Sequence, residues 1–426
     1  MKRLLAIAFS SMALAGFADA FTVTDVSARQ RWPWNGLVDV DFTIAGASVA
    51  DLFKVEVEAA YDGGTKKLYA RTYLEEPLRG PGFNRITWDL AADYPELKVD
   101  DLQVAVTVTP LSRASLDAQN VYMVIDLSSG PNSTRYPVRY TTTAPTLVPT
   151  NDLVACAADP NRTTKLWLKR VKANTFPFGG TNSNSGEGDF KVSLSPYYIG
   201  VFELTQKQWA LVMDTWPSVF SNDIYRAARP VSNINNDEII GHNNWPENRV
   251  MADGSYVAKM RARTGLATFS LPTEAQWECA SRAGSAVTTQ ISKSTGRCAD
   301  YVSTSGVNTY NEGPEVGTAL VGSYNANAWG LYDMFGNVME MCLDAHDTVD
   351  NLKTLYGWNA ETREPIQDPI GPGVNATARY HATRGGSYGN SAGFCASHRR
   401  DYNSRSETGT KRASIGFRVA VSPEWN

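Results

Sequence analysis

The pattern of apolar residues changes near residue 145, and this change limits the fold of the chain more than any other feature. Before it, apolar and polar residues alternate in "LVDVDFTI" (37–44), "KVEVEAAY" (54–61) and "DLQVAVTV" (101–108). Alternation with period two is typical of half-buried β-strands. The apolar face of the first segment consists of Val38, Val40, Phe42 and Ile44. The first part of the chain is therefore predicted to consist of strands.

Two more segments, "NRITWDL" (84–90) and "VYMVIDL" (121–127), raise the expected number of strands to about six or seven. Glycine-rich turn signals separate the segments. Residues 21–145 are therefore predicted to form an all-β sandwich of the immunoglobulin or fibronectin type. This region has no catalytic constellation in its sequence, so a packing or adhesion role is expected for it.

The next segment, 146–160, is predicted to be a linker, because threonine and proline replace the alternation and favour an extended, solvated backbone. Residues 161–426 are rich in Trp, Tyr, Asn and Gly and have few long periodic runs. This composition predicts an irregular second domain with little regular structure.

Three helices are expected in the second domain. Thr205 and Gln208 form the sequence pattern of a capping box, which predicts that a helix begins there. A second helix is expected to end at Gly265, and a third to begin near Thr273, with Trp277 as its buried anchor.

Residues 1–20 have the pattern of a secretory signal peptide. Two basic residues precede an apolar run that ends at Phe17, and residues 18–20 read Ala-Asp-Ala, a small-x-small cleavage pattern. We expect cleavage after Ala20 and a secreted or periplasmic protein; an uncleaved anchor is the alternative. No other stretch has the roughly 20 apolar residues that a transmembrane helix requires.

The charge balance and the cysteines restrict the partners and the redox chemistry. A formal net charge of −4 gives no basic stripe for phosphate contacts, so nucleic acid is not an expected partner. The four histidines lack HxxxH or HExxH spacing, so no zinc site is predicted. An odd number of cysteines in an exported chain leaves at least one outside intramolecular disulfides. The cysteines are Cys156, Cys279, Cys298, Cys342 and Cys395.

Five motifs follow one another in the second domain. They are "YYIGVFELTQKQW" (197–209), "LPTEAQWECASRAG" (271–284), "NAWGLYDMFGNVMEM" (327–341), "RGGSY" (384–388) and "ASIGFRVA" (413–420). In this order they resemble the formylglycine-generating enzyme, or sulfatase-modifying factor, family. The resemblance covers residues 161–426 and implies an irregular α+β domain with a fold related to C-type lectins.

The resemblance also implies a catalytic cleft. In the family, copper held by two cysteines, with molecular oxygen, oxidises a sulfatase cysteine to formylglycine. The second cysteine corresponds to Cys395, but the first corresponds to Asn390, which cannot replace a thiolate as a ligand for soft Cu(I). Ser387 matches the family, whereas three further cleft positions differ, namely Phe394, Ala396 and Met339. Copper is therefore not expected, and Cys395 and Ser387 are catalytic candidates by family position only.

Calcium is the cofactor that the resemblance favours. The family pattern of side-chain and carbonyl oxygens corresponds to Asp333, Gly336, Val338 and Glu340. Oxygen ligands of this kind suit Ca²⁺. The alternative is a turn stabilised by asparagine and glycine without an ion. A second calcium site is expected near Asp300 and Tyr301.

The family packs the segment around Cys342 near the cleft, and this implies a disulfide between Cys342 and Cys395 in an oxidising compartment. Alternatively, the Cys342 thiol could replace the missing copper ligand. The pairing of Cys156, Cys279 and Cys298 stays open.

Two functions are compatible with these residues. In the first, the second domain is a calcium-stabilised binding or interaction module for a protein, peptide or glycan, without copper-dependent oxidation. In the second, it is a divergent formylglycine-generating oxidase that acts on sulfatase cysteines. The missing second soft ligand favours the first.

Overall fold

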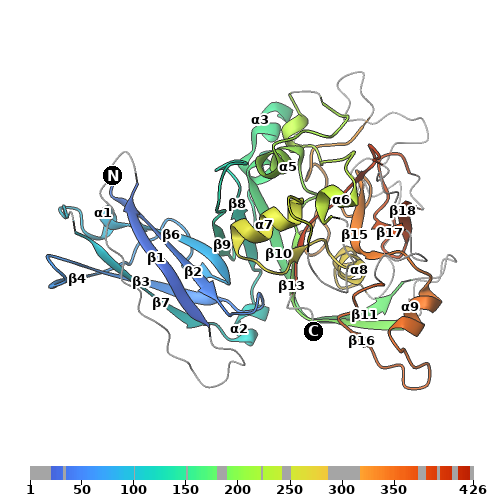
Figure 1. The fold of residues 1–426 in the computed structure, drawn as a ribbon, viewed down its shortest axis with the longest axis horizontal. Helices are drawn as coiled ribbons and strands as arrows, with labels where there is room; N and C mark the ends of the chain where they lie inside the picture. Colours follow the sequence, from blue (N-terminus) through green and yellow to red (C-terminus); the bar gives the residue numbers. More distant parts are fainter. Residues whose placement is uncertain are drawn as a thin grey trace.

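The computed structural model has an N-terminal region of strands at one end and a larger part with helices and irregular segments at the other (Figure 1). It describes residues 21–31, 35–99, 101–149, 152–179, 190–221, 224–241, 251–285, 317–372, 380–390, 394–404 and 411–422. The predicted signal peptide lies outside the described residues. Within them, no helix is long and apolar enough to cross a membrane.

The N-terminal region consists of two sets of strands around one core. In the first set, β2 lies between β1 and β6; in the second, β3 pairs with β4, β5 and β7. Their bounds are β1 (Thr22–Gln30), β2 (Leu37–Ala45), β3 (Phe53–Tyr61), β4 (Lys66–Tyr69), β5 (Leu78–Arg79), β6 (Gly82–Asp89) and β7 (Gln103–Pro110). Both sets contribute to one apolar cluster, in which the predicted face of β2 is at most 1% exposed. The period-two prediction is confirmed for this strand.

The segment "VYMVIDL" does not belong to that core. It forms β8 (Tyr122–Asp126), which lies between β9 (Val138–Thr141) and β10 (Lys165–Val171). Met123 and Ile125 face the main core of the second part, whereas Tyr122 and Val124 face a smaller apolar cluster. A strand that is buried on both faces shows no alternation, so its sequence could not indicate which sheet it joins. The predicted domain boundary at residue 145 therefore falls inside a continuous sheet.

The predicted linker, 146–160, contains the short helix α3 (Leu153–Ala158) and ends at the first residue of a second one, α4 (Pro160–Thr163). Asp159 caps α4 and forms a buried ion pair with Arg162, whose Nη1 lies 2.7 Å from Asp159 Oδ2. The Arg162 guanidinium also donates to the carbonyl oxygens of Val321 and Gly322. These contacts attach the segment to the second part, which differs from the extended, solvated chain that its Thr and Pro content predicts.

The second part completes a 13-stranded sheet in which β10, β13, β20 and β14 follow β8. Two smaller sheets have the strand orders β11-β12-β16 and β18-β17-β15-β19. The strands are β11 (Asn174–Phe178), β12 (Phe190–Leu194), β13 (Tyr197–Gly200), β14 (Phe269–Ser270), β15 (Met339–Ala345), β16 (Ile366–Gln367), β17 (Tyr380–Arg384), β18 (Asp401–Ser404), β19 (Ile415–Gly416) and β20 (Ala420–Val421). The other elements are α1 (Leu90–Asp93), α2 (Arg113–Asp117), α5 (Gln206–Met213), the 3₁₀ helix η1 (Arg226–Ala228), α6 (Asn236–Ile239), α7 (Tyr256–Thr264), α8 (Glu274–Arg282) and α9 (Val349–Leu355).

The three predicted helices of the second part are confirmed as α5, α7 and α8. Thr205 and Thr273 cap α5 and α8 with complete capping boxes, and Gly265 ends α7 in a left-handed conformation. Trp277 on α8 is fully buried. Helix ends are encoded by nearby residues, so they can be inferred from the sequence.

The N-terminal region joins the second part through a close backbone contact. A Cβ on Gly82, the first residue of β6, would lie 2.6 Å from the carbonyl oxygen of Thr264 at the end of α7. Gly82 also has a φ of +95°, which side chains rarely adopt. Arg263, which precedes Thr264 in the sequence, donates to the hydroxyl of Tyr136 at 2.8 Å. The first β region and α7 are therefore packed without room for an additional carbon atom.

We expect Gly82→Ala to lower the free energy of unfolding by about 3 kcal/mol or more, because the new methyl group meets backbone as well as unfavourable φ. Gly64→Ala is the matched control, since Gly64 has a similar φ of +89° but its nearest contact lies 3.8 Å away. The control should lose only about 1–2 kcal/mol. Urea denaturation measures both, and equal losses would contradict the close contact.

Candidate functional site

The turn "RGGSY" after β17 lies against the segment predicted to bind calcium. The amide of Gly336 donates to the carbonyl of Gly385, and the amide of Tyr388 donates to the carbonyl of Asn337, both at 2.9 Å. Gly385 and Gly386 have φ values of +89° and +69°, so the turn requires glycine at both positions. Backbone hydrogen bonds thus join the glycine turn to the segment that is predicted to bind calcium.

Asn390 closes this turn by binding Ser387. Its Oδ1 accepts from the Ser387 amide at 2.9 Å and from the Ser387 hydroxyl at 2.8 Å. The backbone amide of Asn390 in turn donates to the backbone carbonyl of Ser387 at 2.9 Å. Both lone pairs of the carboxamide oxygen are used inside the turn. The structure therefore brings these two predicted residues together as a structural pair.

Cys395 lies beneath the turn and is 1% exposed. Its Sγ is 2.7 Å from the position that a Cβ on Gly386 would occupy, so the thiol packs directly on this glycine. The adjoining hollow has no space for a water molecule. It is lined by Met339, Thr383, Arg384, Gly385, Gly386, Phe394, Arg399 and Asp401. Among the described residues, this hollow is therefore filled by side chains and backbone.

The expected disulfide between Cys342 and Cys395 is not formed. Cys342 is buried on β15 in an apolar cluster with Ala382 and Trp277, whereas Cys395 packs on Gly386. Burial, and then the charge of Glu274, raises the pKa of the Cys342 thiol well above its usual range. Cys156 and Cys279 are likewise thiols, and Cys298 lies outside the described residues. The two thiols fill separate packing sites, which explains why they do not bond.

Glu340, a predicted calcium ligand, forms a buried ion pair. Arg418 donates from Nε to Oε2 at 2.6 Å and from Nη2 to Oε1 at 2.7 Å. The Trp277 indole donates to Glu340 Oε2 at 2.8 Å. Both carboxylate oxygens therefore already have strong donors, and the positive guanidinium takes the place expected for a cation beside this side chain. Glu340 does not fit as a calcium ligand in this arrangement.

Glu203 is a buried acidic residue close to Asp333 and Glu340, and the sequence analysis did not identify it. It accepts from Asn337 Nδ2 at 2.6 Å and from the Val338 amide at 3.0 Å. Burial, and then the negative charge of Asp333, raises the pKa of Glu203 well above its usual range. The available signal was a lone glutamate in the apolar stretch of the first family motif.

Asp333 is the predicted ligand that fits a cation best. Its Oδ2 accepts from the Gly322 amide at 2.6 Å, while its buried Oδ1 has no hydrogen-bond partner among the described residues. Burial raises the pKa of Asp333 to about 6. No group of three His, Cys, Asp or Glu side chains in the described part of the chain has the arrangement of a metal site. Asp300 and Tyr301, the predicted second calcium site, lie outside that part.

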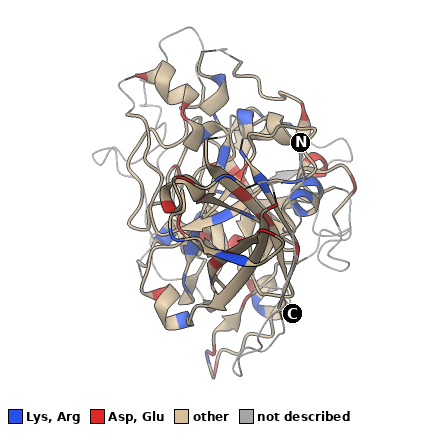
Figure 2. Ribbon diagram, turned by 90° about the vertical axis from the view of Figure 1, so that its left-hand side faces the viewer, with Lys and Arg blue, Asp and Glu red and all other residues tan. Residues whose placement is uncertain are grey.

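A second buried network surrounds α8. Arg400 forms a bidentate pair with Glu274, with both N···O distances at 2.7 Å. Glu278 pairs with Arg282 at 2.7 Å and also with Arg384, the first residue of the glycine turn motif. Burial alone would raise the pKa of Glu274, but the charge and hydrogen bonds of Arg400 outweigh it and lower the pKa. Acidic and basic residues lie interspersed through the fold (Figure 2).

Asp344 lies next to this network on β15. Its two oxygens accept from the amides of Glu274 and Gly371. Burial, and then the charge of Glu274, raises the pKa of Asp344 to about 7. This carboxyl group therefore holds a proton in the folded state at mildly acidic pH.

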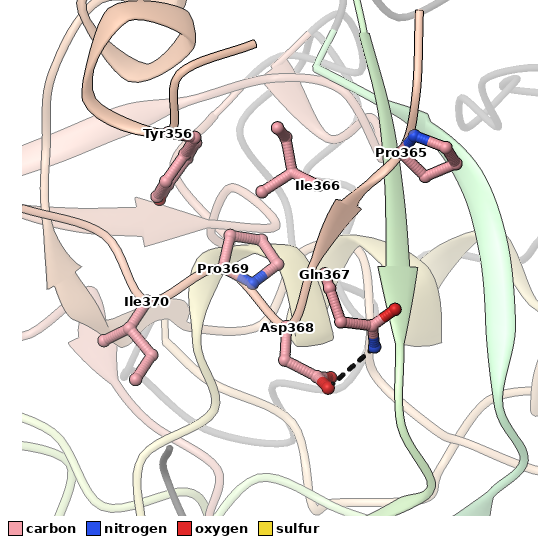
Figure 3. Close-up of a pocket in the computed structure, with 7 residues that line it drawn as sticks. All are labelled: Tyr356, Pro365, Ile366, Gln367, Asp368, Pro369 and Ile370. Atoms are coloured by element: carbon pink, nitrogen blue, oxygen red, sulfur yellow. Dashed lines mark hydrogen bonds between the residues drawn. The ribbon is translucent and has the colours of Figure 1, made fainter.

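A separate open pocket of about 500 Å³ lies at β16 (Figure 3). It is lined by Tyr356, Pro365, Ile366, Gln367, Asp368, Pro369 and Ile370. Asp368 accepts from the Ser195 amide and hydroxyl, both at 2.7 Å, and from Gln367 Nε2 at 2.8 Å. Its carboxylate is thus used to hold the β16 segment on the sheet. The described site residues predicted from the sequence lie elsewhere.

Comparison with known proteins identifies the class to which this fold and cleft belong. The profile of the sulfatase-modifying factor enzyme 1-like domain matches residues 168–423, which is more than half of the chain. The chain belongs to this family, and the resemblance inferred from the five motifs is confirmed.

Individual proteins are also similar in sequence to parts of this chain. Chaperone protein LppX of Paenibacillus barcinonensis is 30% identical over 226 residues, which cover 46% of this chain and 77% of that protein. The formylglycine-generating enzyme of Thermomonospora curvata is 32% identical over 161 residues, covering 36% of this chain and 49% of the enzyme. That of Streptomyces coelicolor is 32% identical over 166 residues, covering 35% and 46%. The chain thus matches about half the length of these two enzymes.

Two solved structures resemble this one in fold alone. Treponema denticola variable protein 1 has 23% identity and a TM-score of 0.44, covering 61% of this chain and 96% of that protein. PvdO from Pseudomonas aeruginosa has 21% identity and a TM-score of 0.45, covering 60% and 94%.

The buried proton of Asp344 predicts a pH dependence. As the pH rises from about 4 to about 7, the folded state still binds a proton that the unfolded state has released, so this group lowers stability by at most about 1.4 kcal/mol per pH unit. Asp344→Asn lacks this contribution. We therefore expect the wild type to become more stable relative to the variant as the pH falls from 8 to 5. Urea denaturation at the two pH values measures this.

Asp368→Asn is the control, because it also removes a carboxylate that accepts a backbone hydrogen bond. A stability difference between wild type and Asp344→Asn that is the same at pH 5 and pH 8 would show that Asp344 binds no extra proton.

Proposed function

We propose that this exported protein is a calcium-stabilised binding module whose sulfatase-modifying-factor-like domain lacks copper-dependent cysteine oxidation. One observation carries the proposal: Asn390, at the family position of the first cysteine, uses its carboxamide oxygen to bind Ser387. Cu(I) favours soft sulfur ligands, and a single buried thiol at Cys395 supplies only one.

The closed cleft supports the same function. An oxidase has to admit a cysteine of its substrate, but the hollow beside Gly386 has no water-sized space among the described residues. The relative LppX is named as a chaperone, which is a binding function, and it is similar over 226 residues. A divergent oxidase would need another opening and another soft ligand. Binding therefore takes place on the surface of the domain.

Calcium is proposed as a structural ion. Asp333, whose buried Oδ1 has no partner among the described residues, and the carbonyl oxygens of Gly336 and Val338 would hold it. The ion would add positive charge beside the carboxyl groups of Glu203, Asp333 and Glu340. Glu340 would act through its ion pair with Arg418 instead of as a ligand.

The N-terminal region has a supporting role in this proposal. Its two strand sets would form an immunoglobulin- or fibronectin-like sandwich that presents the C-type-lectin-like domain outside the cell or in the periplasm, after removal of residues 1–20. Its continuous sheet with β8 and β10 favours a rigid connection over independent motion.

We expect the protein to yield no aldehyde when it is supplied with Cu(I), oxygen and a peptide that carries a sulfatase-type cysteine. Mass spectrometry of the peptide measures the product, and an active formylglycine-generating enzyme assayed in parallel is the control. Asn390→Cys should gain Cu(I) affinity over wild type, since it adds the second thiol. Formylglycine produced by wild type would overturn the proposed function.

Removal of calcium should lower the melting temperature, because an ion that binds only the folded state stabilises it by mass action. The shift should reverse when calcium is restored, and it should be smaller in Asp333→Asn, which weakens the site. Differential scanning fluorimetry with and without a chelator measures this. An unchanged melt in wild type, with no calcium in the purified protein, would argue against the ion.

A further inference from the structure

The strand β16 forms one edge of the small sheet β11-β12-β16, beside the open pocket of about 500 Å³. It pairs in parallel with β12, where Ile366 lies opposite Val192 and Gln367 lies opposite Ser193. No described strand pairs with its other side. A pocket that adjoins a free sheet edge can bind both the side chains and the backbone of a ligand.

Gln367 carries the free backbone groups of this edge. The Asp368 amide donates to the Ser193 carbonyl at 2.8 Å, so the backbone N–H of Asp368 faces β12. Backbone groups of successive residues in a strand point to opposite sides, and the N–H and C=O of Gln367 therefore point away from β12. Neither group has a hydrogen-bond partner among the described residues. Together they offer one donor and one acceptor to a ligand.

Two prolines limit the free edge to this one residue. Pro365 and Pro369 line the pocket and flank Gln367 in the sequence, and proline has no N–H. Asp368 has a φ of +41°, so the extended backbone ends directly after Gln367. Prolines and short strands prevent continuous edge-to-edge pairing between proteins. The edge therefore suits a short ligand better than a second copy of the sheet.

Apolar side chains form most of the pocket wall. Five of the seven lining residues are Tyr, Pro or Ile, so the pocket favours an apolar group of the ligand. Tyr356, which follows α9, and Ile370 lie on the same side of the β16 segment in Figure 3. The Tyr356 ring packs on Phe190 of β12, with the ring centroids 6.4 Å apart. This contact fixes the aromatic wall of the pocket.

The segment that lines the pocket is held at two points. The Asp368 carboxylate accepts from the amide and the hydroxyl of Ser195, and the Gly371 amide donates to Asp344. Gln367 Nε2 also donates to Asp368 Oδ2 at 2.8 Å (Figure 3). A segment that is fixed before binding loses little entropy when a ligand arrives.

We propose that the β16 pocket binds an extended peptide segment of another protein. This inference rests on the proposed binding function and specifies its ligand class. The peptide backbone accepts from the Gln367 N–H and donates to the Gln367 carbonyl, and an apolar side chain of the peptide contacts Tyr356 and Ile370. The two backbone groups of Gln367 have the spacing and direction of a β-ladder, which a second backbone matches.

Fluorescence anisotropy of the full protein with four labelled peptides tests the proposal. The peptides have the sequence Ser-Thr-Thr-X-Thr-Thr-Ser, with Leu, Ile, Phe or Tyr at X. At least one should bind, and Asp at X should weaken its affinity about tenfold or more. N-methylation of each peptide amide in turn should weaken binding most strongly at one position, because Gln367 offers a single carbonyl acceptor.

Variants of the pocket separate the backbone contact from the side-chain contact. Gln367→Pro removes the outward N–H and should lower the affinity about tenfold, with the melting temperature retained, since proline is tolerated where a strand N–H is unpaired. Gln367→Ala keeps the backbone and should bind nearly as wild type. Ile370→Ala should weaken binding. Leu355→Ala is its matched control, because Leu355 is 54% exposed on α9 and does not line the pocket.

Three outcomes would overturn the proposal. They are no binding of the four peptides at about 1 mM, affinity that neither N-methylation nor Ile370→Ala weakens, and binding of N-acetyl-leucine amide as tight as that of the peptide. The last would assign the pocket to a small apolar molecule. Formylglycine production would overturn the proposed function but leave a Gln367-dependent peptide affinity in place. Absence of peptide binding would leave the aldehyde assay unchanged, so the two failures are distinguishable.

Discussion

The buried ion pair between Glu340 and Arg418 is the interaction on which the second part of the structure depends. Besides both oxygens of Glu340, the guanidinium of Arg418 binds the carbonyl oxygens of Gly200, Tyr332 and Asp333. Burying two charges costs several kcal/mol per ion, which only complete hydrogen bonding offsets, and loss of one partner leaves the other uncompensated. The pair therefore holds β13, β15 and the last motif in a single arrangement.

This arrangement also determines the state of the cleft. With β15 fixed, the backbone of Gly336 and Asn337 binds the glycine turn, and the turn positions Gly386 over the Cys395 thiol. Buried ion pairs and glycines at positive φ hold this part of the core in one arrangement. Rigidity of this kind suits a scaffold that presents surface residues, because a preorganised surface loses less entropy on binding.

The sequence predicts those features that depend on neighbouring residues. The capping boxes at Thr205 and Thr273 and the buried face of β2 follow from local patterns, and the family is evident from five ordered motifs. Features that depend on distant partners could not be predicted in the same way. β8 pairs with β10 across the expected boundary, and Glu203 accepts a hydrogen bond from Asn337, which belongs to a different motif. The disulfide prediction failed because shared proximity to a cleft does not fix the direction of two side chains.

The two kinds of site place different demands on the same scaffold. Copper-dependent oxidation needs two thiolates at one position, and this chain has Asn390 at one of the two family positions. A binding surface, in contrast, needs only exposed groups on a rigid scaffold. The buried ion pairs stabilise the domain whether or not the cleft reacts. At the family position of the first cysteine, Asn390 instead supplies the hydrogen bonds that close the turn.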